Sequence, residues 1–253
     1  MQDEQRWTRS LQGFVVLNLQ KMASKEKPRI AIILSASAEW KTALSEFNNT
    51  LVVPSPIGDH FTATLAGRSC LFFHGGWGKV SAAAGTQYII DHWQPDLIIN
   101  IGTCGGFEGL VSVGEVILAS ETVIYDIIER MGNPRKAIEH YTTRIDLSFL
   151  RKLYPHPVKI GRLVSADQDI DPTMVTSLST DFSTVAADWE SGAIAWTATR
   201  NSTRVLILRT VSDLVSPAGG ELYDQGDFHD RAREVMLPLL QSLPAWIECA
   251  LHG

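Results

Sequence analysis

The stretch Pro95–Gly106, PDLIINIGTCGG, decides the fold of this chain. Residues 97–101 are apolar nearly throughout, which is typical of a β-strand that is covered on both faces. We interpret the next five residues, Gly102–Gly106, as a glycine-rich turn. Glycines let backbone N–H groups approach a ligand closely, because no Cβ intervenes. We therefore expect a buried strand with a ligand-binding turn at its carboxyl end.

Strand-like and helix-like segments alternate on both sides of this stretch. The expected strands are 30–34, 61–66, 69–74, 97–101, 115–120, 160–165, 184–187 and 205–208. The expected helices are 38–47, 79–93, 145–153, 189–200 and, with kinks at Pro238 and Pro244, 229–251. Residues 67–68 join two of the strands into a hairpin, and the run 130–144 is expected to be a solvated loop. The alternation predicts an α/β fold with a largely parallel sheet and helices on both sides.

The length and composition favour one large domain. The chain has 253 residues, of which 45% are apolar and 20% charged, so it is neither disordered nor fibrous. No internal repeat or Pro/Ser linker divides it. We expect residues 29–253 to form a single domain and residues 1–28 to be an N-terminal extension, with disorder as one alternative. Met22 is a second candidate for the start of the chain.

Several classes of protein are excluded by composition. The chain has 22 basic and 28 acidic residues, a net charge of −6, which argues against a nucleic acid partner. We find no apolar window long enough for a membrane helix and no secretory signal. Three scattered cysteines and seven scattered histidines form neither a disulfide framework nor a metal site. We expect a cytoplasmic protein that uses no metal and no cofactor.

Three acidic residues lie where ligands bind in open α/β sheets, beyond the carboxyl ends of strands. Glu39 follows the strand 30–34, while Glu190 and Asp213 follow two later strands. An alternative interpretation remains open for Glu39 and Glu190, since an acid in the first turn of a helix is favoured by the helix dipole without any function. Asp213 has less structural reason to be there, because residues 214–217 do not continue as a helix.

A second glycine-rich turn, Gly75–Gly78, contains Trp77, and Trp189 directly precedes Glu190. The two indoles either form flat walls for a ring system or are simply core residues. The turn lacks the third glycine of a dinucleotide fingerprint and the spacing of a Walker loop. The glycines alone are therefore weak signals for a nucleotide.

Five segments together resemble the ordered motifs of the nucleoside phosphorylase and nucleosidase superfamily. They are 30–39, 76–83, 95–106, 188–195 and 208–213. Within the superfamily the chain is most similar to the methylthioadenosine/S-adenosylhomocysteine nucleosidases, and the likeness covers roughly residues 29–250. The resemblance implies a three-layer α/β/α sandwich with a central mixed, partly barrel-like sheet. It also implies a homodimer and a role in methionine salvage.

The resemblance favours hydrolysis over phosphorolysis. Phosphorylases of this superfamily place one arginine two residues before the first glycine of the glycine-rich turn and another in the first loop. Here those places hold Asn100 and the neutral stretch 35–38. Without the guanidinium groups that suit phosphate, water is the expected nucleophile.

The resemblance also implies roles for individual residues. Asp213 would protonate N7 of the purine as general acid, and Glu39 would activate the attacking water. Glu190 would accept hydrogen bonds from the ribose hydroxyls, while Arg209 and Thr103 would orient the water. The remaining expected substrate-binding residues are Trp77, Cys104, Gly105, Asp169, Ile170, Trp189 and Ser212.

Some residues depart from the family pattern and leave the 5′ substituent open. Asp169 occupies a place where an aromatic residue often stacks on adenine, although the backbone near Asp169 and Ile170 can still contact the base. Trp77 and Trp189 replace smaller side chains near the sugar and narrow that pocket. Segment 126–144 has Tyr141 as its only aromatic residue, fewer than usually complete the 5′ pocket across a dimer.

The predicted activity is thus an N-glycosyl hydrolase that releases adenine from methylthioadenosine- or S-adenosylhomocysteine-type nucleosides. One alternative is a nucleosidase or phosphorylase for another purine nucleoside, such as a futalosine-type compound. Another is a binding or storage protein on the same scaffold. The expected partners are a small nucleoside, water and a second copy of the chain.

Overall fold

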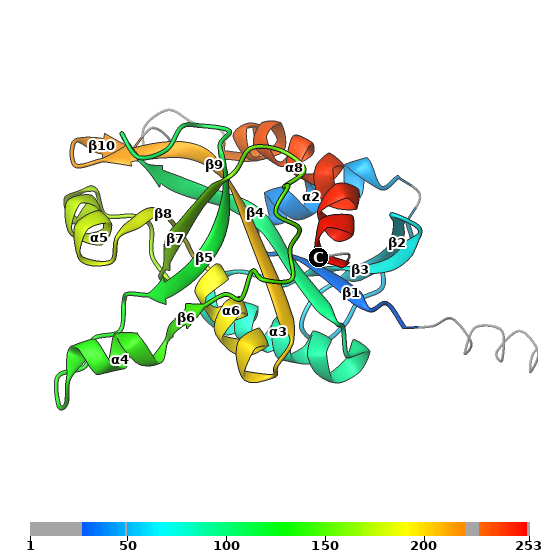
Figure 1. Cartoon of the computed structure of the whole chain (residues 1–253), viewed down its shortest axis with the longest axis horizontal. Coiled ribbons are helices and arrows are strands. Elements are labelled where there is room, and N and C mark those ends of the chain that lie inside the picture. The colour runs from blue at the N-terminus through cyan, green and yellow to red at the C-terminus, as the bar shows by residue number, and fades with distance from the viewer. Residues whose placement is uncertain (1–26, 49, 221–227, 252–253) are drawn as a thin grey trace, which may run out of the picture.

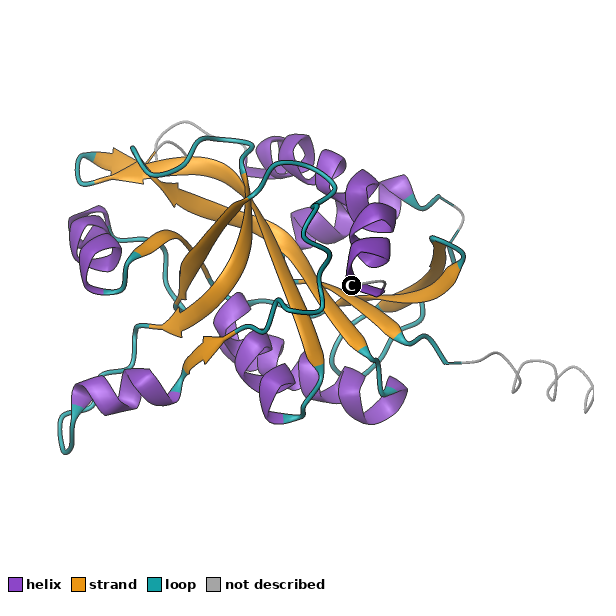
Figure 2. Ribbon diagram, in the orientation of Figure 1, coloured by secondary structure: helices purple, strands orange, loops and turns teal. Residues whose placement is uncertain are grey.

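The computed structural model describes residues 27–48, 50–220 and 228–251, which form one mixed sheet with helices on both sides (Figure 1, Figure 2). The strands are β1 Ile30–Leu34, β2 His60–Leu65, β3 Arg68–His74, β4 Leu97–Phe107, β5 Val116–Ile124, β6 Thr142–Arg144, β7 Lys159–Ser165, β8 Thr184–Asp188, β9 Arg204–Ser216 and β10 Gly219–Gly220. The helices are α2 Ser37–Glu46, α3 Gly78–Trp93, α4 Pro134–His140, the 3₁₀ helix η1 Pro172–Met174, α5 Val175–Asp181, α6 Ser191–Arg200 and α8 Phe228–Leu251. The expected extension, 1–28, lies outside the described residues except for its last two.

The sheet is the middle layer of three. Successive side chains of a strand point to opposite faces, so Leu97, Ile99 and Ile101 of β4 pack with α2 and α8. Ile98 of the same strand packs on the other face, against α3 and α6. Apolar side chains are therefore needed at nearly every position of β4, as its sequence suggested. The predicted α/β/α sandwich is confirmed.

Part of the sheet closes on itself. The strands follow the order β10-β9-β5-β7-β8-β4-β1-β3-β2, and β4 also pairs with β9. The second pairing joins β9, β5, β7, β8 and β4 into a closed ring. Parallel pairs link β1 to β3 and β4, whereas β4 with β8 and β5 with β9 run antiparallel. The predicted mixed, partly barrel-like sheet is thus correct, while the largely parallel sheet inferred from alternation alone is only partly so.

The expected hairpin is present between β2 and β3, which pair antiparallel. Ala66 and Gly67 at its turn have φ values of 48° and 71°. Two successive residues with positive φ suit the right-handed twist of hairpin strands, and glycine adopts this conformation without strain.

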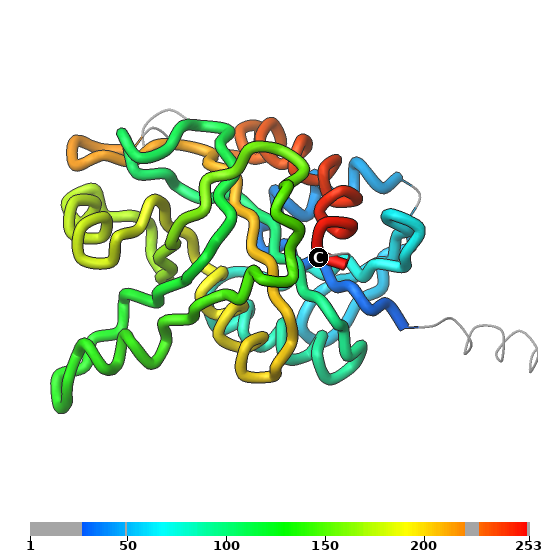
Figure 3. Tube along the Cα trace, viewed as in Figure 1, coloured from blue at the N-terminus to red at the C-terminus, as the bar shows by residue number. Residues whose placement is uncertain are grey.

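The first and last of the described helices lie on the same face of the sheet. α8 packs against α2, and the blue and red parts of the trace lie together in Figure 3. Pro238 and Pro244 both lie inside α8, which changes direction along its length (Figure 1). No helix in the described ranges has both the length and the apolar character needed to cross a bilayer.

Two predicted segments are wrong. Residues 145–153 do not form a helix, because Ile145 packs into one apolar cluster while Phe149 and Leu150 pack into the other, beside α8. The run 130–144 is not a plain loop, since it contains α4 and β6. The signal for α4 was in the sequence: Asn133 accepts hydrogen bonds from the N–H groups of Arg135 and Lys136, and Pro134 occupies the first helical position.

The predicted boundaries near the site also need correction. The expected turn Gly102–Gly106 lies within β4, which continues to Phe107, and Asp213 lies within β9 rather than after it. Both strands extend because they pair with each other as far as Phe107 and Val215, and β4 also pairs with β8 where the barrel closes. α6 begins at Ser191, so Glu190 is its N-cap rather than part of its first turn. η1 and α5 had not been predicted.

Candidate active site

A cavity of about 300 Å³ opens where loops leave the carboxyl ends of β1, β3, β5, β7 and β8, beside the middle of β4 and β9. Its lining residues are Ala36, Glu39, Trp77, Thr103, Cys104, Gly105, Tyr125, Gln168, Asp169, Ile170, Ala187, Asp188, Trp189, Glu190, Ser212, Asp213, Val215 and Phe228. Of the twelve site residues predicted from the sequence, eleven line this cavity; Arg209 does not.

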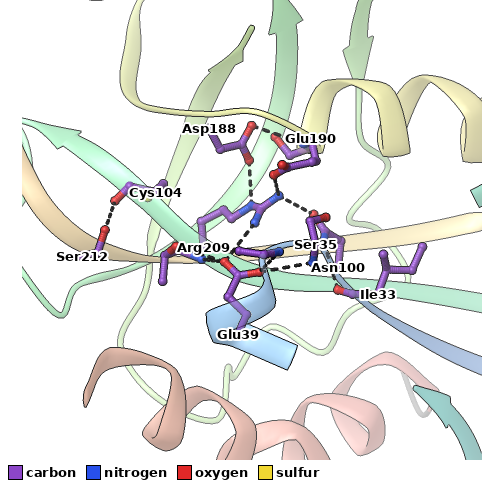
Figure 4. A network of polar contacts seen from close by, with 12 residues as sticks. Ile33, Ser35, Glu39, Asn100, Cys104, Asp188, Glu190, Arg209 and Ser212 are labelled. Carbon is purple, nitrogen blue, oxygen red and sulfur yellow. Dashed lines mark hydrogen bonds and ion pairs between the residues drawn. The ribbon is translucent and has the colours of Figure 1, made fainter. Parts of the chain in front are cut away.

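Arg209 lies directly behind the cavity and organises its acids (Figure 4). Its side chain is 1% exposed, and its Nε lies 2.7 Å from Oδ2 of Asp188. Its Nη2 donates to Oδ1 of Asn100 at 3.0 Å and lies 3.7 Å from Oε2 of Glu190. Breaking such a buried pair leaves an uncompensated charge. Arg209 therefore positions the acids, while its contact with the attacking water stays a prediction.

Gly102 makes room for this guanidinium. A Cβ at Gly102 would lie 1.9 Å from Nη1 of Arg209 and 2.8 Å from Oε1 of Glu39. The glycine of the predicted turn thus serves a close approach between β4 and a side chain of β9, not a change of chain direction.

Glu39 is held by both of its carboxylate oxygens. Oε2 accepts from the backbone N–H groups of Ser35 and Ala36, at 3.2 and 3.1 Å. Oε1 accepts from the N–H and the hydroxyl of Thr103, at 2.7 and 3.0 Å, and lies 4.0 Å from Nη1 of Arg209. The carboxylate caps the start of α2 and also lines the cavity. Its structural role is thus observed, while its role in catalysis stays a prediction.

Glu190 is the acid whose protonation the fold alters most clearly. Burial raises the pKa of Glu190 to about 8, the nearby carboxylates of Asp188 and Glu39 act in the same direction, and Arg209 opposes them. Its Oε1 accepts from the N–H of Gly78 at 3.2 Å. Near neutral pH this carboxyl group can therefore donate as well as accept a hydrogen bond.

Asp213 lies at an irregularity in the pairing of β9 with β4. Cys104 faces Val211 and Gly105 faces Asp213, so Ser212 is the extra residue of a bulge. The hydroxyl of Ser212 donates a hydrogen bond to Oδ1 of Asp213 at 2.6 Å. The carbonyl oxygen of Cys104, 3.2 Å away, is a second acceptor within its reach. The bulge explains why both Ser212 and Asp213 line the cavity although they are neighbours on a strand.

The segment after β7 forms the wall of the cavity that faces the backbone of β4. A Cβ at Gly105 would lie 2.5 Å from Cδ1 of Ile170, so Ile170 packs directly over the β4 backbone. Gln168 donates to the hydroxyl of Tyr125 at 3.3 Å. A flat slot bounded by Ile170 and the backbone of β4 suits a planar ring, and Asp213 lies on its border.

The two tryptophans lie together at the cavity. The rings of Trp77 and Trp189 stack with centroids 5.5 Å apart and an angle of 11° between their planes. Trp77 is 73% exposed. The interpretation of these tryptophans as core residues is therefore wrong for Trp77.

Sequence reasoning missed several lining residues, among them Asp188, Tyr125 and Phe228. Asp188 ends β8, and its Oδ1 accepts from the hydroxyl of Ser165 at 2.5 Å and from the N–H of Ser191 at 3.2 Å. An acid at the carboxyl end of a strand was an available signal. Tyr125 and Phe228 come from opposite parts of the chain and carried none.

The described residues contain no group of three or more His, Cys, Asp or Glu side chains arranged to hold a metal ion. Cys70, Cys104 and Cys249 are all buried and unpaired with one another. The ring of Tyr141 lies tilted against that of Trp196 and does not line the cavity.

The fold and the site define an α/β protein whose barrel wall carries a small-molecule pocket rich in carboxyl groups. The family model of the phosphorylase superfamily matches residues 29–243, and the chain belongs to this superfamily. A similar curated protein is the 5′-methylthioadenosine/S-adenosylhomocysteine nucleosidase of Lysinibacillus sphaericus, 24% identical over 209 residues, with 78% of this chain and 91% of the relative covered.

Solved structures of the same kind share the fold. The methylthioadenosine/S-adenosylhomocysteine nucleosidase of S. pneumoniae, solved with the transition-state inhibitor MT-ImmA, aligns with a TM-score of 0.69 at 22% identity. That alignment covers 87% of this chain and 98% of the other. A futalosine hydrolase mutant of Helicobacter pylori aligns with a TM-score of 0.68 at 14% identity, over 87% and 98% of the two chains.

Proposed function

We propose that this chain is a purine nucleosidase, which hydrolyses the N-glycosidic bond of methylthioadenosine- or S-adenosylhomocysteine-type nucleosides and releases adenine. The observation that carries the proposal is the convergence of Glu39, Glu190 and Asp213 on one cavity. The curated relative named above supports the substrate class.

The bond itself explains why several acids are needed. Cleavage of an N-glycosidic bond leaves positive charge on the ribose and negative charge on the departing purine. An acid that protonates the purine and a base that removes a proton from the attacking water divide this work between them. Water then supplies the hydroxyl group on the ribose, and its other proton leaves through the base.

Glu39 is the proposed base. Its four N–H and O–H donors fix the carboxylate in one orientation at the cavity wall. A base held in this way needs little reorganisation when it accepts a proton. Thr103 both donates to Glu39 and lines the cavity, so it can orient the same water.

Asp213 is the proposed acid at N7 of the purine. The hydroxyl of Ser212 has a single hydrogen, although both the carboxyl of Asp213 and the carbonyl of Cys104 lie within its reach. When that hydrogen points to Cys104, Ser212 Oγ can accept a hydrogen bond from the protonated form of Asp213. The bulge thus lets Ser212 hydrogen-bond to Asp213 both before and after Asp213 gives up its proton.

Glu190 and the slot beside Ile170 would hold the two halves of the nucleoside. The carboxyl of Glu190 would bind the ribose hydroxyls, and the backbone of Cys104, Gly105, Asp169 and Ile170 would contact the base. Arg209 keeps Glu190 and Asp188 in place from behind the cavity.

The residues at the place where a phosphorylase would hold phosphate favour water as the nucleophile. Asn100 is fully buried, accepts from Arg209 and donates to the carbonyl of Ile33 at 3.1 Å. Its amide is therefore committed to the protein interior. Phosphate entering here would meet the carboxylates of Glu39 and Asp188 without a free guanidinium.

A futalosine-type purine nucleoside is the second candidate substrate. The structural likeness to a futalosine hydrolase shows a shared fold, and the tryptophan pair sets this chain's 5′ pocket apart from the smaller side chains expected there. A storage protein would not need Glu39, Glu190 and Asp213 in one cavity, so their presence there argues against the storage alternative.

The proposal extends to the organisation of the protein. Residues 29–253 form one catalytic unit that acts in the cytoplasm as a homodimer, uses no cofactor and serves methionine salvage. Light scattering at micromolar concentration is expected to return twice the monomer mass. A monomer mass would remove the dimer from the proposal.

Base release in phosphate-free buffer, followed by chromatography, tests the reaction. Asp213→Asn and Glu39→Gln are each expected to lower kcat/KM roughly 10²–10⁴-fold, the usual contribution of one positioned proton transfer. Glu46→Gln is the matched control, because Glu46 is an exposed residue of the same helix as Glu39. Wild-type rates in both active-site variants would refute the mechanism, and binding without turnover would indicate the storage alternative.

A further inference from the structure

The stacked tryptophans are joined to the two backbone points that fix Glu190. Trp189 directly precedes Glu190, and Trp77 directly precedes Gly78, whose N–H donates to Oε1 of Glu190. The stack therefore stands at the Glu190 end of the cavity, whereas Asp213 and Ile170 line the slot assigned to the base.

The stack itself is closed to a ligand ring. Its centroids are 5.5 Å apart, whereas a ring inserted between them would require about twice the usual stacking distance. One face of Trp77 is covered by Trp189, and much of the remainder is exposed. The pair thus fills space near the ribose and presents an apolar surface at the cavity mouth.

The charges around the cavity have one sign. In the described part of the chain, no Lys, Arg or His side chain lines the cavity, whereas five carboxyl groups do: Glu39, Asp169, Asp188, Asp213 and Glu190, the last of which keeps its proton for much of the time near neutral pH. Arg209 is buried and paired behind them. Lys79, two residues after Trp77, is held by Asp126 and Asp167. A carboxylate carried by a ligand would find no unpaired cation among these groups.

Resting on the proposed function, we propose that Trp77 and Trp189 make this enzyme selective for nucleosides with a compact, uncharged 5′ group. With the base beside Asp213 and the ribose beside Glu190, the 5′ carbon points toward the indole pair. A short thioether can lie against the indoles. A long group that ends in a carboxylate must pass them and remain near several acids.

The expected discrimination is measurable. At an effective dielectric constant of about 20, one uncompensated pair of like charges about 10 Å apart changes an equilibrium roughly 10-fold. S-Adenosylhomocysteine also carries an ammonium group, which these acids attract, so the charged probe is 5′-(3-carboxypropylthio)adenosine, whose 5′ group ends in a carboxylate alone. We therefore expect kcat/KM for 5′-methylthioadenosine to exceed that for this probe at least about 10-fold. 5′-Butylthioadenosine, which is long but uncharged, separates the effect of length from that of charge.

Three variants assign the effects. Trp77→Ala and Trp189→Met are expected to raise kcat/KM for 5′-butylthioadenosine relative to 5′-methylthioadenosine, while the preference against the carboxylate remains. Trp196→Phe, a change to a tryptophan that does not line the cavity, is expected to leave both ratios unchanged. Thermal unfolding checks that each variant is folded, and the high exposure of Trp77 makes Trp77→Ala a mild change for the fold.

The outcomes separate this inference from the proposed reaction. Equal kcat/KM values for the three thioethers in the wild type, or ratios unchanged in both tryptophan variants, would overturn the inference and leave the reaction standing. Failure to release base from any nucleoside tested would refute the reaction, and the selectivity would fall with it.

Discussion

Replacing Glu190 by glutamine is expected to change the pH dependence of this protein's stability in a defined direction. Burial, the largest cause, raises the pKa of Glu190 from its usual 4.5 to about 8 in the folded chain. In the unfolded chain the carboxyl group ionises near its usual pKa. Between these two values this group binds its proton in the folded state but not in the unfolded state, so the contribution of Glu190 to stability falls as pH rises through this window.

The magnitude follows from the size of the shift. Each pH unit in the window removes about 1.4 kcal/mol of the contribution that Glu190 makes to the free energy of unfolding. The loss is about 3 kcal/mol between pH 5 and 7 and about 5 kcal/mol over the whole window. Glutamine carries no proton to lose, and its Oε1 can still accept from the N–H of Gly78. Relative to wild type, Glu190→Gln should therefore gain stability with rising pH.

Urea unfolding at pH 5, 6, 7 and 8 measures this difference. Glu248→Gln is the control, because an exposed side chain meets nearly the same solvent in both states and its effect should stay constant over the range. A difference between Glu190→Gln and wild type that is equally constant would refute the reasoning. A plateau is expected above about pH 8.5, where both states of the wild type have lost the proton.

Two substitutions and one thiol reactivity test the packing around the site, and a third substitution tests the core. Asn100→Ala leaves a buried donor of Arg209 without its acceptor, and urea unfolding should show a loss of about 1–3 kcal/mol; an unchanged midpoint would contradict that contact. Gly102→Ala forces a Cβ against Arg209 and should lower both Tm and kcat, so wild-type values of both would contradict the close approach. Burial, the largest cause, raises the pKa of the Cys104 thiol well above its usual value, and this thiol should react with a disulfide reagent at pH 8 far more slowly in native than in urea-unfolded protein. Leu243→Ala in α8, at 0% exposure, should cost about 2–5 kcal/mol of stability with kcat unchanged, and a loss of kcat in the folded variant would show that α8 acts on the site.

The motifs of the site could be read from the sequence because each is local. Glu39, Glu190 and Asp213 all follow recognisable apolar segments, and all three line the cavity. The burial of Arg209 behind the cavity could not be predicted in the same way, because burial depends on what packs around a side chain. The Gly102–Gly106 stretch was assigned to a turn for a similar reason: its extended conformation depends on β8 and β9, which come much later in the chain.

Local patterns failed where distant contacts decide the conformation. Residues 145–153 have helical spacing of apolar residues, yet their side chains pack into two different hydrophobic clusters, on opposite faces of the sheet. Tyr125 and Phe228 line the cavity although they are about a hundred residues apart in the sequence. The periodicity of a single segment cannot predict that two such distant residues line the same cavity.

The sequence by itself determined the layers, the family and most of the acids at the cavity, because hydrophobic periodicity and short motifs are properties of neighbouring residues. Only the tertiary structure decided how those acids are used. Barrel closure brings β4 beside β9, places Arg209 behind Glu39 and Glu190, and creates the bulge at Ser212. It also stacks Trp77 on Trp189. The protonation of Glu190 depends on burial and on charges supplied by other elements, and these exist only once the chain has folded.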